Sequence, residues 1–199
     1  MTRRFNLGSS FGVMQGRLSP QSELGYQVFP WESWKTEFGL ASDRQLEHIE
    51  WVLDAKTLDR NPILNSVAEI RRKVDETGVQ VLSVCADYLM DRPLEVEGDE
   101  SWKTIEVLLE SMGALGASWV VIPYVDQSSL LRKGATEGML AISDRLGELA
   151  QEVHVEVCLE TDLNPEDYVN LLRQLNPDVY SVNYDSGNSA SLGYSLDEE

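Results

Sequence analysis

The sequence predicts an α/β fold of the (β/α)8 barrel type, with about six of the eight strand–helix units present. Short apolar, β-branched runs recur at intervals of roughly 25 to 40 residues, and helical patterns lie between them. Several of these runs end in a carboxylate, where parallel α/β sheets place their chemistry. Neither a GxGxxG motif nor a Walker A motif follows a strand, which disfavours a nucleotide-binding fold. Repeated βα units in a parallel sheet are therefore expected.

Six strands are expected, at residues 11–15, 48–54, 79–87, 119–125, 155–160 and 179–185. Helices are expected between them, at about 32–46, 61–78, 99–113, 129–153 and 164–176. Gly78 should end the second helix, whereas Asn164 and Pro165 suit the start of the last one. Pro123 lies within the fourth strand and has no N–H to donate, so a bulge or an interruption is expected there.

The composition is that of one globular domain spanning residues 1–199, since 42% of the residues are hydrophobic and 25% are charged. The formal net charge of -18 would repel a phosphate backbone, so nucleic acid is not expected as a partner. No apolar run reaches membrane-spanning length and no signal-like start occurs, so no membrane is expected and the cytoplasm is the expected compartment. Cys85 and Cys158 fall in apolar runs and are expected to be buried thiols.

A candidate metal site lies in the stretch from Glu156 to Asn188, which reads as strand, helix and strand in a βαβ unit. Glu160 and Asp185 end the two strands, so both carboxylates should lie at the same edge of the sheet. Two acids held close together need a cation or a shared proton, which predicts half of a divalent-metal site. Alternatively, the two acids cap helices or order loops, with residues 185–187 forming a turn.

Five further residues are candidates for substrate binding. Gln15 ends the first strand and Arg17 follows it, where Arg17 either contacts the substrate or neutralises an acidic mouth. Alternation in the second strand turns Glu50 away from the apolar side, and Asp87 ends the third strand. Both acids either bind substrate or serve as hydrogen-bonded polar groups of the barrel. Asn183 and Asp185 lie on the same face of the sixth expected strand, so Asn183 can orient a ligand.

Seven short motifs follow one another along the chain. They are Val13-Met14-Gln15-Gly16-Arg17-Leu18, Phe29-Pro30-Trp31, Ile49-Glu50-Trp51, Cys85-Ala86-Asp87-Tyr88, Ile122-Pro123-Tyr124-Val125-Asp126, Leu159-Glu160-Thr161 and Tyr184-Asp185-Ser186-Gly187-Asn188. In order and spacing this set resembles the sugar phosphate isomerase/epimerase family, whose members have a xylose-isomerase-like TIM barrel. The resemblance runs from the first strand to the end of the chain. It implies a (β/α)8 TIM-barrel type that is incomplete at the C-terminus.

The resemblance implies one divalent metal ion, manganese first, with magnesium, cobalt or zinc as alternatives. Glu160 and Asp185 match two of the four metal ligands of the family. The family's His and second Glu would fall beyond Glu199, so this chain departs from the pattern. The resemblance also implies that Glu160 is catalytic and removes the proton next to a carbonyl, while the metal stabilises the enediolate.

Three functions follow as hypotheses. The first is a metal-dependent isomerase or epimerase of a small sugar or sugar phosphate. The second is an inactive, truncated barrel that only binds or associates, because the outer strands of an open sheet have unpaired edges that favour homo-oligomers. The third is an endonuclease IV-like phosphodiesterase on the same barrel, which the negative charge and the scarcity of histidine disfavour. We prefer the first. The sequence leaves open which sugar is bound and whether it is phosphorylated.

Overall fold

The structure is a computed structural model that describes residues 10–21, 23, 25–96 and 99–195. Six parallel strands form one sheet in the order β1-β2-β3-β4-β5-β6, so each strand pairs with its neighbour in the chain. The strands are β1 (Gly12–Met14), β2 (His48–Val52), β3 (Gln80–Cys85), β4 (Trp119–Tyr124), β5 (Glu156–Thr161) and β6 (Tyr180–Val182).

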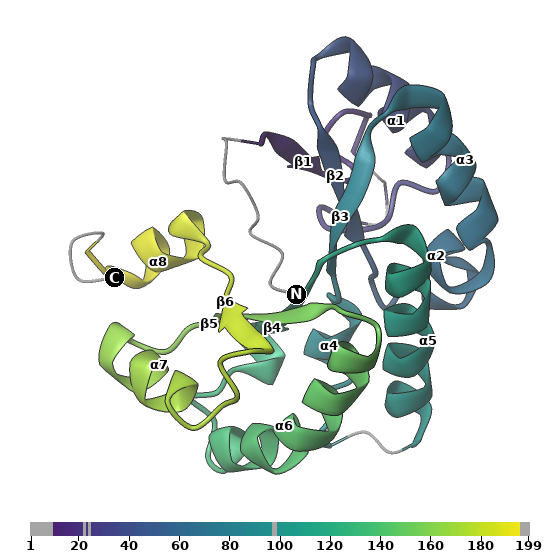
Figure 1. The fold of residues 1–199 in the computed structure, drawn as a ribbon. Coiled ribbons are helices and arrows are strands. Elements are labelled where there is room, and N and C mark those ends of the chain that lie inside the picture. Colours follow the sequence, from purple (N-terminus) through teal and green to yellow (C-terminus); the bar gives the residue numbers. More distant parts are fainter. Residues whose placement is uncertain (1–9, 22, 24, 97–98, 196–199) are drawn as a thin grey trace.

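Helices follow the strands and cover one side of the curved sheet (Figure 1). Neighbouring helices of this layer contact one another, α1 with α3, α3 with α5, and α5 with α6. The helices are α1 (Trp34–Asp43), α2 (Pro62–Asn65), α3 (Val67–Thr77), α4 (Tyr88–Asp91), α5 (Asp99–Leu115), α6 (Ala135–Glu152), α7 (Pro165–Leu172) and α8 (Ser186–Leu192), with 3-10 turns η1 (Leu58–Arg60) and η2 (Asp126–Ser128). Among the described residues, no helix is both long and apolar enough to cross a membrane.

The sheet is open rather than closed on itself. Within the described part of the chain, β1 pairs with β2 alone and β6 pairs with β5 alone. The two edges predicted from the sequence are therefore present. Association of two copies through these edges stays a prediction.

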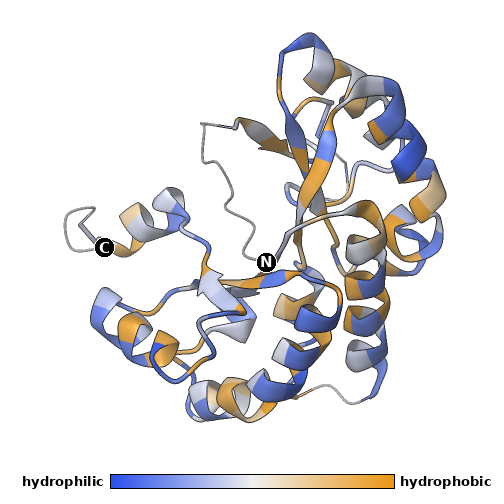
Figure 2. Ribbon diagram, viewed as in Figure 1, coloured by the Kyte–Doolittle hydropathy of each residue, from blue (hydrophilic) through white to orange (hydrophobic). Residues whose placement is uncertain are grey.

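The core lies between the sheet and the helix layer. Hydrophobic residues, coloured orange in Figure 2, occur both along the strands and on the helices that cover them. The alternation predicted for β2 is confirmed, because Ile49, Trp51 and Leu53 belong to the core cluster, whereas Glu50 and Val52 do not. Trp51 stacks at 5.1 Å from the ring of Phe29 and at 5.4 Å from that of Trp34. This aromatic cluster fixes the loop before α1 to the sheet.

The helix predicted over 61–78 is interrupted, which corrects the sequence-based expectation. It divides into α2 and α3 at Ser66, whose backbone φ is −147°. The preceding Asn65 donates its side-chain N–H to the carbonyls of Asp59 and Asn61. Polar side chains that bond nearby backbone groups compete with helix formation, which explains the break. Gly78 ends α3 in the left-handed region, as predicted.

Of the two outcomes expected at Pro123, the bulge does not occur, whereas the interruption does, because the β3–β4 ladder ends before this residue. Pro123 pairs in register with Glu160 on β5. The carbonyl of Val121 accepts a hydrogen bond from Ala86, so alternate residues of β4 face the β3 side. The pairing of β3 with β4 ends at Cys85 and Val121. The missing N–H of Pro123 therefore faces a region beyond the ladder, where no donor is needed.

Asn61→Ala should lower the free energy of unfolding by about 3 kcal/mol. Asn61 is fully buried, and its Oδ1 accepts hydrogen bonds from Trp51 Nε1 at 2.8 Å and Ile63 N at 3.2 Å. Its amide donates to the Val52 carbonyl at 3.0 Å, so the substitution leaves three buried groups unpaired. Urea unfolding measures the loss. Asn170→Ala, at an exposed position on α7, is the control and should cost less than about 1 kcal/mol.

Candidate functional site

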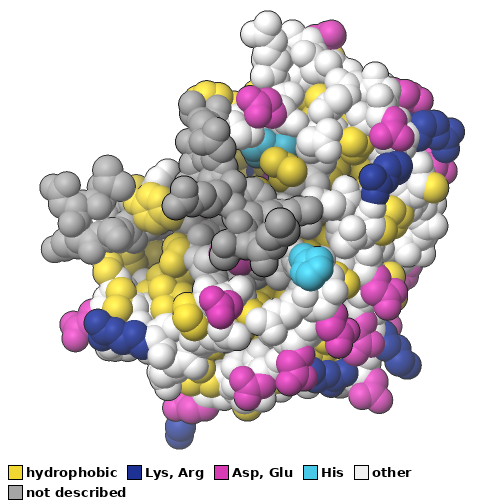
Figure 3. Space-filling model, viewed as in Figure 1, with side chains coloured by type: hydrophobic (Ala, Val, Ile, Leu, Met, Phe, Trp, Pro, Cys, Tyr) yellow, Lys and Arg dark blue, Asp and Glu magenta, His cyan; other side chains and the backbone are white. Residues whose placement is uncertain are grey.

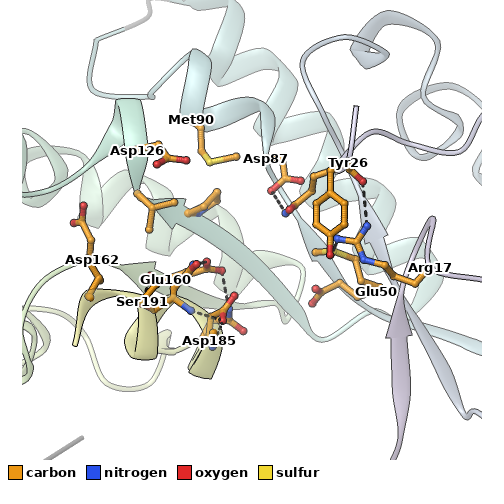
Figure 4. Close-up of a pocket in the computed structure, with 18 residues that line it drawn as sticks. Arg17, Tyr26, Glu50, Asp87, Met90, Asp126, Glu160, Asp162, Asp185 and Ser191 are labelled. Atoms are coloured by element: carbon orange, nitrogen blue, oxygen red, sulfur yellow. Dashed lines mark hydrogen bonds between the residues drawn. The ribbon is translucent and has the colours of Figure 1, made fainter. Parts of the chain in front are cut away.

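A cavity of about 500 Å³ opens at the carboxyl ends of the strands. Its walls come from strand ends and from the loop between β1 and α1 (Figure 4). Six predicted site residues line it, namely Arg17, Glu50, Asp87, Glu160, Asn183 and Asp185. The structure thus brings together residues that are far apart in the sequence, and their roles stay predictions.

Gln15 is the predicted site residue that the structure does not place in this cavity. Its neighbour Met14 lines the cavity, whereas the Gln15 side chain is 2% exposed and lies against β2. There its Oε1 accepts a hydrogen bond from Val52 N at 3.4 Å. Successive side chains of an extended chain point to opposite sides, which explains the different placement of these two neighbours.

Glu160 is the best-defined acid of the cavity. It ends β5, and both of its carboxylate oxygens accept hydrogen bonds from side-chain amides. Oε2 is 2.9 Å from Asn183 Nδ2, and Oε1 is 2.7 Å from Asn188 Nδ2. These two contacts fix the plane of the carboxylate. Asn188 was not predicted from the sequence as a site residue.

The pKa of Glu160 is raised to about 7. Burial is the largest cause, and the negative charge of Asp185 is the next. More distant Asp87 and Glu50 act in the same direction, while the hydrogen bond from Asn183 opposes them. Glu160 is therefore half-protonated near neutral pH, which suits a group that gives and takes protons.

Asp185 precedes α8 and caps it. Its Oδ1 accepts hydrogen bonds from the backbone N–H groups of Gly187 at 2.7 Å and Asn188 at 2.9 Å. The capping interpretation raised for Asp185 is therefore confirmed for this oxygen. The same cap holds Asn188 against Glu160, so it also organises the cavity.

The donor set suits a hard cation. The described residues that line the cavity contribute carboxylates and amides, with no histidine or cysteine among them. Oxygen ligands favour magnesium or manganese over softer metals. Within the described ranges, no group of three or more His, Cys, Asp or Glu side chains is placed to hold a metal ion. Glu160 and Asp185 thus fit a divalent ion as two of its ligands and do not complete its coordination.

Asp87 lies across the cavity from this pair, near Gln27 and Arg17 (Figure 4). Its side chain is 4% exposed, and Oδ1 accepts hydrogen bonds from Gln27 Nε2 at 3.3 Å and Cys85 Sγ at 3.0 Å. Burial, with repulsion from Glu50 as a smaller cause, raises the pKa of Asp87 to about 6. Its Oδ2 is buried with no hydrogen-bond partner in the described structure.

Arg17 is the one Lys or Arg among the described residues lining the cavity. Its Nη1 donates to the Tyr26 carbonyl at 3.0 Å, and its guanidinium lies 3.9 Å from the centre of the Tyr26 ring. Its Nη2 approaches Met14 Sδ at 3.6 Å. The guanidinium therefore already holds the loop over the cavity.

Two buried acids that the sequence did not single out hold this loop. Glu37 accepts hydrogen bonds from Gly16 N at 2.9 Å, Leu18 N at 3.3 Å and Ser19 Oγ at 2.6 Å. Asp54 accepts one from Phe29 N at 3.0 Å, at the other end of the loop. Glu37 lies on a helical pattern with no local signal for such a contact.

Glu37→Gln should lower the free energy of unfolding by about 2 kcal/mol, because the amide N–H₂ cannot accept the loop's hydrogen bonds. The loop should also open more often, so trypsin should cleave after Arg17 faster. Urea unfolding and limited proteolysis measure the two effects. Exposed Glu32→Gln is the control. Equal cleavage of both variants would show that Glu37 does not hold the loop.

Asp87→Asn should remove the part of the pH dependence of the free energy of unfolding that comes from this carboxyl. The folded pKa, about 6, lies above the ordinary 3.8, so the folded state keeps the proton that the unfolded state loses between these values. The contribution of Asp87 to the free energy of unfolding is therefore favourable below pH 4, and it is lost as the pH rises to about 6. The variant should therefore gain about 2 kcal/mol over wild type between pH 4 and 7.

Urea unfolding across this pH range measures the difference. Asp75→Asn, at an exposed position on α3, should show no such gain. A constant difference between the Asp87 variant and wild type would contradict the burial argument.

A scan against protein-family models and a search of curated proteins give no match. Solved structures do match. An IolI protein with a zinc atom aligns with a TM-score of 0.63 at 15% identity, covering 82% of this chain and 62% of that one. A xylose isomerase-like TIM barrel protein from Mycobacterium smegmatis in complex with magnesium aligns with a TM-score of 0.67 at 15% identity, covering 90% and 65%.

A D-psicose 3-epimerase with D-tagatose from Clostridium cellulolyticum H10 aligns with a TM-score of 0.66 at 13% identity, covering 94% and 66%. The chain thus spans 62% to 66% of the length of these three proteins. It shares their fold, so the prediction of a (β/α)8 TIM-barrel type with six βα units is confirmed.

Proposed function

We propose that the cavity is the sugar site of a divalent-metal-dependent isomerase or epimerase that works through an enediolate. The observation that carries the proposal is Glu160, a carboxylate with a pKa of about 7 held beside Asp185 in a polar cavity. Structures with the same fold include a D-psicose 3-epimerase with D-tagatose, which supports a sugar as the ligand.

Manganese or magnesium would bind to Glu160 and Asp185. Water, sugar hydroxyls or groups beyond the described residues would complete its coordination. Bound there, such an ion would supply Lewis-acid chemistry to the oxygens of a sugar. It would also offset the repulsion between the two carboxylates that raises the pKa of Glu160.

Glu160 would transfer the proton at the carbon next to the carbonyl. A bound metal ion would lower the pKa of Glu160 from its metal-free value of about 7, which would favour the carboxylate form that removes a proton. Asn183 and Asn188 hold its carboxylate in one orientation, which limits the positions from which the proton is taken. Substrate-binding roles are proposed for Arg17, Glu50, Asp87 and Asn183, whose side chains line the same cavity.

A phosphodiesterase is the weaker candidate, because the described lining residues include six carboxylates and one guanidinium. Such a wall repels a phosphate backbone. An inactive chain that only associates is distinguished from the enzyme by the metal-binding and deuterium-exchange experiment described next. The cytoplasm as compartment and association through β1 and β6 remain predictions.

Manganese should bind the chain, and Glu160→Gln should weaken binding at least tenfold by removing one charged ligand. Calorimetry measures this. In D₂O, the metal-loaded chain should incorporate deuterium at the carbon next to the carbonyl of a ketose, and the variant should not.

Glu156→Gln is the matched control, because Glu156 starts the same strand at the end away from the cavity. It should behave as wild type. Metal binding and exchange that survive in Glu160→Gln would rule out the proposed role of Glu160.

A further inference from the structure

The cavity wall is strongly acidic. Its described lining includes six carboxylates, from Glu50, Asp87, Asp126, Glu160, Asp162 and Asp185, against the guanidinium of Arg17. The formal charge is therefore six negative minus one positive, or -5, and a bound divalent ion would leave -3. Acidic side chains are also frequent on the visible surface (Figure 3), in keeping with the net charge of -18. A ligand that carries a phosphate would enter against this field.

Asp87 adds an observation that points to the kind of ligand. It lines the cavity and is 4% exposed, yet its Oδ2 has no hydrogen-bond partner in the described structure. A buried carboxylate oxygen without a partner costs free energy that a donor would recover. A hydroxyl can donate to it, whereas an ionised phosphate oxygen only accepts.

Glu50 continues this surface. It lines the cavity beside Asp87, and its Oε2 accepts a hydrogen bond from Ser83 Oγ at 2.7 Å. Two carboxylates on the β2–β3 side thus present acceptors to a ligand. A polyol supplies several donors at short spacing, which matches such a wall.

Arg17 does not offset this preference. Its guanidinium already stacks on Tyr26 and donates to the Tyr26 carbonyl. Bidentate binding of a phosphate needs a guanidinium edge with two available donors. A phosphate would have to use the remaining N–H groups of Arg17, and this one positive charge stands against six carboxylates of the lining.

We propose that the cavity selects an uncharged polyhydroxylated sugar over a phosphorylated one, with a sugar hydroxyl donating to Asp87 Oδ2. The inference rests on the proposed function and names its substrate class. Asp87 acts here as a specificity-determining contact on the side opposite Glu160.

The test compares D-fructose with D-fructose 6-phosphate, which differ by one phosphate. Saturation-transfer NMR and calorimetry on the full chain, with and without magnesium, measure binding apart from turnover. D-Fructose should bind at least tenfold tighter than D-fructose 6-phosphate. Asp87→Asn, which keeps the side-chain shape, should weaken D-fructose binding about tenfold, because the charged acceptor is lost.

Asp91→Asn is the control. Asp91 is an exposed carboxylate at the end of α4, the short helix that Asp87 precedes, and it does not line the cavity. It should bind D-fructose as wild type does. Circular dichroism confirms that both variants fold, so a loss of binding in Asp87→Asn is attributable to the contact.

Three results would overturn the inference: tighter binding of D-fructose 6-phosphate that is lost in Arg17→Met, unchanged D-fructose binding in Asp87→Asn, or no binding of D-fructose. Failure of the proposed function gives a different result from failure of this inference. If D-fructose binds through Asp87 but neither it nor another bound ketose exchanges deuterium, the isomerase or epimerase is contradicted and the substrate preference stands. If the phosphorylated sugar binds better and exchanges, the enzyme stands and this preference falls.

Discussion

Parallel pairing of neighbouring strands is the constraint on which the site depends. It brings every carboxyl end to one edge of the sheet, so each acid that ends a strand faces the others. β4 pairs with β5 in a regular register that includes the pair Pro123 and Glu160. β5 pairs in turn with β6, as far as the pair Leu159 and Val182. Because this register is fixed, Glu160 is held beside the segment that follows β6 and carries Asp185.

The sheet therefore holds like charges together, and the surroundings compensate for them in part. Amide donors from Asn183 and Asn188 satisfy Glu160, while backbone N–H groups satisfy one oxygen of Asp185. The raised pKa of Glu160 shows that compensation is incomplete. A divalent cation would supply the missing positive charge, which supports the proposal that the site is part of a metal centre.

Much of this arrangement was predictable from local sequence patterns. Runs of β-branched residues that end in Glu160 or Asp185 located both the strands and the cavity, because strand periodicity and parallel topology are short-range signals. The break at Ser66 was missed, because it depends on which side chain bonds which carbonyl, and this is not written in a local pattern. At Pro123 the local pattern predicted a bulge or an interruption, but which of the two occurs depends on where the neighbouring strand ends.

The acids that hold the loop were beyond sequence reasoning for the same physical reason. Glu37 contacts Gly16 across 21 residues of chain, and Asp54 contacts Phe29 across 25. Gln15 was predicted for the cavity because it follows a strand, but its side chain turns toward β2. Contacts of this kind appear only after the chain has folded. Residues on strand ends were therefore found and residues that support loops were not.

The most direct test of the account is the titration of the Glu160 carboxyl carbon by ¹³C NMR, with and without magnesium. The account predicts a pKa of about 7 in the metal-free chain and a fall below about 5 when magnesium is added. An ordinary pKa near 4.5 that magnesium leaves unchanged would contradict it, because Glu160 would then be neither buried among acids nor a metal ligand.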